Sequence, residues 1–237
     1  MFIPLLTFCL KIAPCLNVLW YAIIAILKHI QKILYRDHTE QTKGDFIMEL
    51  VEPIRDTKKI DRMKKYLKEK STRDYCLFVL GINSGLRISD LLNLQVKDVA
   101  ENNGKLKERI SITEQKTGKT KDFPISDTAS KAIKEQLDAL KSKEPTSHLF
   151  PSRKGGGAIQ RYQAWRILNE AAKHSGLADD AIGTHTMRKT FGYHAYKKGM
   201  DITIIQKLLN HSSPSITLSY IGITRDDLDN VYLNLNL

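Results

Sequence analysis

Cysteine is scarce in this chain, and no cysteine belongs to a recognisable set of metal ligands. The three cysteines, Cys9, Cys15 and Cys76, are odd in number, and no pair has metal-ligand spacing with a nearby histidine. Cys76 lies in an apolar helical stretch and is expected to be a reduced residue of the core. This cysteine usage favours a reducing, cytoplasmic compartment for the globular part of the chain.

Long apolar runs are also scarce. The longest, residues 15–27, has about 13 residues, whereas a helix that spans a membrane needs about 20. Counting from residue 2 lengthens the run but includes Lys11 and two prolines. A secretory signal starts with basic residues and ends at a small-residue cleavage site. Neither feature is clear in this sequence, so secretion is not expected.

Three interpretations of the apolar segment at residues 1–47 remain. It is a membrane-associated helix, an apolar helix that packs on the domain or on a partner, or translated upstream sequence with Met48 as the working start. We favour the third, because the globular pattern begins just after Met48. The predicted organisation is therefore an apolar N-terminal segment, with membrane association left open, and one domain at residues 48–237.

The chain is basic, with a formal net charge of +11, and 42% of its residues are hydrophobic, as in folded proteins. Residues 1–47 carry only a small part of this charge, so most of it belongs to the predicted domain. A basic surface attracts phosphate polymers or anionic membranes without selecting between them. Charge alone therefore fits nucleic-acid binding and an ordinary lysine-rich surface equally well.

Apolar residues recur mostly at helical spacing. One stretch, residues 109–114, instead alternates, and with residues 121–125 it predicts a β-hairpin that has a very basic tip. The predicted fold class is mainly α with one small antiparallel sheet. The predicted helices cover residues 57–70, 72–82, 89–94, 127–141, 162–174, 186–198 and 202–209, a short segment through Tyr220, and a last segment from Asp226.

Several polar residues stand at points where helices begin or end. Arg87 follows a Gly-Leu pair at a helix break, and His185 and Arg188 share one face at the start of a helix. His211 lies in a polar turn, and Tyr220 follows nine residues later. Taken singly, each residue fits an ordinary structural role.

Taken together and in order, these residues resemble the conserved boxes of the tyrosine recombinase, or phage integrase, family. Residues 85–94, Gly-Leu-Arg-Ile-Ser-Asp-Leu-Leu-Asn-Leu, resemble the first box. His-Thr-Met-Arg-Lys-Thr-Phe at 185–191, Leu-Leu-Asn-His-Ser at 208–212 and then Tyr220 resemble the second. Gln-Lys-Thr-Gly at 115–118 is similar to the family's hairpin segment. The resemblance covers roughly residues 50–237 and implies the family's catalytic-domain fold.

The resemblance implies strand transfer on double-stranded DNA, with Tyr220 as the nucleophile that forms a 3′-phosphotyrosyl link. Arg87 and Arg188 would hold the non-bridging phosphate oxygens, because guanidinium groups are forked donors that stay charged. His211 would add a donor, and His185 would accept the phenolic proton. No metal or other cofactor is expected.

The leaving 5′-oxygen needs a proton, and Lys116 is the preferred donor because it matches the family's Lys-Thr-Gly pattern. Lys119 and Lys121 are the alternatives on the same hairpin. Lys189 and Asn210 stand where histidine and glycine are common, and neither change is expected to abolish catalysis. The side chains expected to contact DNA are Lys119, Lys121, Arg153, Lys154 and Lys189.

Relatives usually carry a separate DNA-binding domain ahead of the catalytic one, whereas in this chain only about 50 residues, a segment apolar rather than basic in character, precede the catalytic pattern. We therefore expect weak independent DNA binding, an oligomer (a tetramer) on DNA, and a possible accessory DNA-binding protein. The last helix packs on its own domain or docks on a neighbouring protomer. The alternative functions are a truncated, non-catalytic DNA-binding regulator of a full-length recombinase and a membrane-associated DNA-binding protein.

Overall fold

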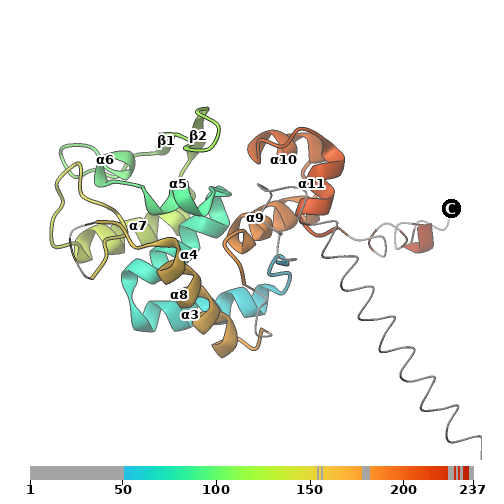
Figure 1. Ribbon diagram of the computed structural model, residues 1–237, viewed down its shortest axis with the longest axis horizontal. Helices are drawn as coiled ribbons and strands as arrows, with labels where there is room; N and C mark the ends of the chain where they lie inside the picture. Colours follow the sequence, from blue (N-terminus) through green and yellow to red (C-terminus); the bar gives the residue numbers. More distant parts are fainter. Residues whose placement is uncertain are drawn as a thin grey trace, which may run out of the picture. The chain divides into compact units, whose positions relative to one another are not determined.

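The computed structural model (Figure 1) describes residues 51–153, 155, 157–177, 182–223, 227, 229 and 232–234. The predictions for residues 1–47 and Lys154 lie outside these ranges, and so does most of the last predicted helix. Within them, no helix is long and apolar enough to cross a membrane.

Helix α4 (Thr72–Ser84) lies at the centre of the main body, which is the part of the chain that packs around the larger apolar core. Helices α3 (Thr57–Lys70), α7 (Asp127–Ala139) and α9 (Thr186–Lys197) pack against it, and α8 (Arg161–His174) packs on α3. A helix surrounded in this way must be apolar on most sides, and five consecutive residues of α4, from Cys76 to Leu80, are buried. The core of the main body therefore forms around α4.

Local polar residues determine where the first helices begin and end. The side chain of Asp56 accepts a hydrogen bond from the backbone N–H of Lys58 and caps α3. Ser71 caps α4 in the same way, by accepting a hydrogen bond from the backbone N–H of Asp74. Gly85 ends α4 with a φ of 60°, a left-handed conformation that glycine adopts without a steric penalty. The chain therefore turns sharply just before Arg87.

Two short helices, α5 (Ile88–Leu92) and α6 (Val96–Val99), connect this turn to the hairpin. Strands β1 (Arg109–Thr113) and β2 (Thr120–Pro124) pair antiparallel, with Ile110 opposite Phe123 on the buried face. The predicted fold class is thereby confirmed. Helix α6 was not predicted, because four residues are too few to show a helical period.

The C-terminal helices have a small core of their own. Helices α10 (Ile202–Leu208) and α11 (Pro214–Tyr220) pack together and against α9, around Tyr193, Ile205, Leu209 and Ile221. This cluster is separate from the main core. Helix α11 and the turn before it carry Tyr220 and His211, and the apolar packing of these two residues on the main body runs through α9.

Candidate active site

Arg188 on α9 ties together the segments that form the site. Its side chain is buried, and its guanidinium donates through Nη1 to the carbonyl oxygen of Gly85 and through Nη2 to that of Leu209. One acceptor ends α4 and the other ends α10. The arginine is therefore held between the main body and the C-terminal helices.

Tyr220 lies beside both predicted histidines. Its phenolic oxygen is 3.1 Å from Nδ1 of His185, and its ring centroid is 4.7 Å from that of His211. Burial raises the pKa of Tyr220, while the positive charges of Arg188 and Arg87 oppose this rise. The phenol is thus protonated at neutral pH and has a histidine nitrogen within hydrogen-bonding distance.

Both histidines are held neutral by burial and nearby cations. Burial lowers the pKa of His185, and the charges of Arg161 and Lys189 lower it further. Burial, followed by the charges of Arg188 and Arg87, lowers the pKa of His211 to about 4. Neutral imidazole has an unprotonated nitrogen that can accept a proton. His185, which lies next to the phenol, is therefore poised to act as a base.

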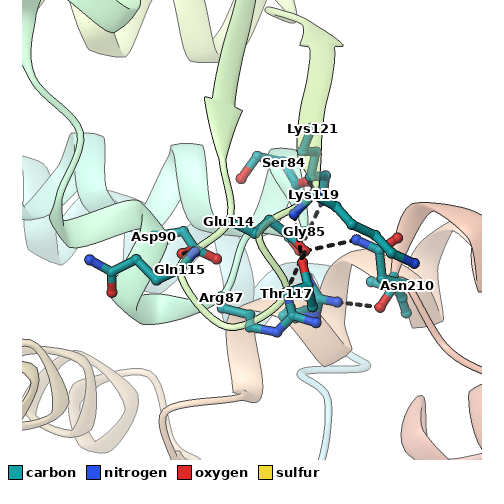
Figure 2. A network of polar contacts seen from close by, with 12 residues as sticks. Ser84, Gly85, Arg87, Asp90, Glu114, Gln115, Thr117, Lys119, Lys121 and Asn210 are labelled. Carbon is teal, nitrogen blue, oxygen red and sulfur yellow. Dashed lines mark hydrogen bonds and ion pairs between the residues drawn. The ribbon is translucent and has the colours of Figure 1, made fainter.

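Arg87 is paired with a carboxylate that the sequence analysis did not single out. Its Nη1 is 2.7 Å from Oε2 of Glu114, which also accepts hydrogen bonds from Thr117 and Asn210 (Figure 2). Ile110, Ile112 and Glu114 alternate along one strand and its end, so they share a face. That alternation is the sequence pattern from which the inward position of Glu114 could have been predicted.

The hairpin lysines occupy different environments. Lys121 is buried, and its ammonium donates to the carbonyl oxygens of Ser84 and Gly85 at 3.2 and 3.4 Å (Figure 2). Burial, and then the charge of Arg188, lowers its pKa to about 8. Lys116 is exposed, but its charge helps to lower the pKa of His185. Both lysines are therefore close enough to influence the site.

Of the residues expected to contact DNA, two are buried and two are exposed among those that the structure describes. Lys121 is buried as described, and Lys189 is also buried, with Nζ 5.2 Å from the ring centroid of Tyr220. Lys119 and Arg153 are exposed. Arg153 lines a separate cavity of about 430 Å³ beside α3 and α8. The charge of these residues alone did not predict which lysines are buried and which are exposed.

The five predicted residues from the two boxes thus gather around one place. In addition to burial, the charges of Arg188 and Arg87 lower the pKa of His211, and they oppose the rise that burial causes in the pKa of Tyr220. His185 contacts the phenol of Tyr220. Two guanidinium groups beside a phenol and a neutral imidazole provide anion binding, a nucleophile and a base in one site. This arrangement suits attack on a phosphodiester.

Comparison with known proteins agrees with this geometry. Residues 55–226 match the model of the phage integrase family. The chain is 49% identical over 179 residues to the probable integrase/recombinase YoeC of Bacillus subtilis (strain 168), covering 76% of this chain and 93% of YoeC. It is 35% identical over 163 residues to the tyrosine recombinase XerD of Corynebacterium glutamicum, covering 68% of this chain but only 51% of XerD.

Solved structures show the same fold. The crystal structure of XerA recombinase matches with a TM-score of 0.63 at 20% identity, covering 82% of this chain and 67% of XerA. XerH bound to a palindromic difH substrate matches with a TM-score of 0.61 at 19% identity, covering 79% of this chain and 54% of the XerH chain. The chain belongs to the phage integrase family and is a recombinase of the tyrosine type.

Proposed function

We propose that this chain cleaves and rejoins DNA through a covalent 3′-phosphotyrosyl intermediate on Tyr220. The observation that carries the proposal is the phenol of Tyr220 at 3.1 Å from Nδ1 of His185, next to the buried Arg188. The name of YoeC, a probable integrase/recombinase, and the Tn1549 transposon integrase solved in complex with transposon right end DNA support DNA as the substrate.

In the proposed cleavage step, the oxygen of Tyr220 attacks a phosphorus atom of DNA, and the bond to the 5′-oxygen breaks. His185 takes the phenolic proton, and a hairpin lysine protonates the leaving 5′-oxygen. Arg87 and Arg188 hold the non-bridging oxygens, where negative charge develops. The phosphotyrosyl ester keeps the energy of the broken bond, so attack by a 5′-hydroxyl reverses the step and rejoins the strand.

The assembly proposed for this reaction is an oligomer on double-stranded DNA, in the cytoplasm where the DNA lies. The chain spans most of YoeC but about half the length of XerD. The proposal also includes an accessory DNA-binding protein, as a source of contacts beyond this domain.

The test uses duplexes with a nick close to a randomised centre, so that cleavage releases a short fragment and traps the adduct. Wild-type protein should form a denaturant-stable complex with DNA, and sequencing the trapped strands would also reveal the target. Tyr220→Phe should bind DNA without forming the complex. Equal trapping by Tyr220→Phe would overturn the proposal, and DNA binding without trapping by either protein would favour the non-catalytic regulator.

A further inference from the structure

Glu114 joins three parts of the site through one carboxylate. Its side chain has no exposed surface, and its Oε2 lies 2.7 Å from Nη1 of Arg87. The same oxygen accepts hydrogen bonds from Oγ1 of Thr117 at 2.7 Å and from Nδ2 of Asn210 at 2.8 Å (Figure 2). These partners belong to the turn after α4, the hairpin tip and the turn between α10 and α11.

The carboxylate of Glu114 is charged at neutral pH despite its burial. Burial raises the pKa of Glu114, but hydrogen bonds from Thr117, Arg87 and Asn210 and the charge of Arg87 outweigh that effect and leave the pKa below its ordinary value. A buried charge is costly unless it is paired and hydrogen-bonded. The contacts of Glu114 therefore depend on one another, because the loss of one partner leaves the buried carboxylate incompletely compensated.

The residues tied by Glu114 each stand at or beside a proposed functional group. Arg87 is itself one of the phosphate-binding arginines, Thr117 follows Lys116, and Asn210 precedes His211. Asn210 has a φ of 49°, which asparagine tolerates better than most residues. Glycine would fit this backbone equally well, but only a side chain such as the amide of asparagine can reach Glu114.

The approach of Glu114 leaves the outer side of Arg87 open. The side chain of Arg87 keeps 17% of its surface exposed, whereas that of Glu114 keeps none. The carboxylate thus meets the guanidinium from the protein interior, through one nitrogen of a group that has five N–H donors. Part of the Arg87 side chain therefore stays accessible while Glu114 holds it.

We propose that Glu114 is a positioning residue, which fixes the positions of Arg87, the hairpin tip and the His211 turn relative to one another around the scissile phosphate. This inference rests on the proposed function. Because α10 and α11 have their own small core, the Glu114–Asn210 hydrogen bond is one of the polar links that place Tyr220 and His211 relative to the main body.

The test measures the rate of adduct formation with enzyme in excess over DNA and well above Kd, together with adduct amplitude, Kd for DNA and thermal stability. Glu114→Gln keeps the shape but removes the charge. It should slow adduct formation by about 100-fold, as expected for a site misplaced by about 1 Å, with amplitude and Kd unchanged. Glu108→Gln, which removes an exposed charge from the same hairpin segment, should match the wild type.

Two variants at Asn210 make the test independent of whether Glu114→Gln folds. Asn210→Gly removes the amide without straining the backbone and should also slow the rate. Asn210→Asp places a second carboxylate against Glu114 and should be slower still. The double variant Glu114→Gln with Asn210→Asp restores a donor–acceptor pair of reversed polarity and should react faster than Asn210→Asp alone.

Three results would overturn the inference while leaving the proposed function intact: a wild-type rate in Glu114→Gln and Asn210→Gly, a faster rate in Glu114→Gln, or no recovery in the double variant. A faster rate would mean that the carboxylate blocks the phosphate. Failure of the wild-type protein itself to form an adduct on Tyr220 would instead contradict the proposed function.

Discussion

At the scale of single residues, the hairpin lysines pose the sharpest question, because Lys116 matches the family's pattern while Lys121 is the buried one. A depressed pKa of about 8 makes Lys121 a ready proton donor. However, its ammonium donates to Ser84 and Gly85. We infer that Lys121 supports the turn before Arg87 and that Lys116 protonates the leaving oxygen.

DNA with sulfur in place of the bridging 5′-oxygen separates these roles, because a thiolate leaves without needing a proton. Lys116→Ala should slow cleavage of normal DNA by about 100-fold or more, and the sulfur substrate should restore its rate. Lys121→Met should be slow on both substrates. If the sulfur substrate rescues Lys121→Met and not Lys116→Ala, the two assignments are reversed.

His211 should make the stability of the fold depend on pH. Its pKa falls from 6.5 to about 4 on folding, so the unfolded chain binds the proton more tightly. Stability is therefore full above pH 6.5 and decreases as the pH falls towards 4. The full shift corresponds to about 3 kcal/mol, and partial exposure of the ring reduces the expected effect to about 1 kcal/mol.

His211→Asn tests this linkage, because its amide can take the place of the ring nitrogen Nδ1, which lies 3.2 Å from Oγ1 of Thr217. Denaturant unfolding between pH 7 and pH 4 should show a smaller loss of stability for the variant than for the wild type. Parallel curves would show that His211 does not titrate in this range.

At the scale of elements, the end of α4 is the most constrained point of the site. The carbonyl of Gly85 accepts hydrogen bonds from Arg188 and Lys121, and a Cβ at this position would lie 2.5 Å from Cδ1 of Phe191. Gly104 also has a positive φ, of 81°, but a Cβ there would meet nothing within 4 Å. Both glycines thus have a left-handed backbone, but only at Gly85 would a Cβ clash with a neighbouring side chain.

Gly85→Ala should destabilise the fold by about 3 kcal/mol, from the left-handed backbone and the clash together. Gly104→Ala should cost only about 1 kcal/mol, from the backbone alone. Unfolding in denaturant measures both values. Equal losses would mean that Phe191 moves aside freely and that the end of α4 is not tightly packed.

The sequence allowed most elements to be predicted, because their signals are local. The adjacent Ser71 and Thr72 both offered a cap for α4, Gly85 marks its end, and alternation marks the hairpin. The residues in the two boxes were found through resemblance rather than geometry. Glu114 was missed because alternation shows only that it points inward, whereas its partner Asn210 is 96 positions away in the chain. Such long-range contacts have no local signal.

At the scale of the whole molecule, the net charge of +11 should make DNA binding strongly dependent on salt. Neutralising about four phosphates predicts a slope near −4 for log affinity against log salt concentration. Lys119→Gln should reduce the slope by about 1, because Lys119 is exposed, whereas Lys121→Met should not change it, because Lys121 is buried. The opposite pattern in fluorescence titrations would contradict these placements.

The central claim is that Tyr220 becomes covalently joined to DNA, and peptide mapping of the trapped complex tests it most directly. Digestion with trypsin and nuclease should leave one peptide that contains residue 220 and carries a nucleotide on the phenol, with a free 5′-hydroxyl on the released strand. A nucleotide on any other residue, or a 5′-phosphate on the released strand, would contradict the account.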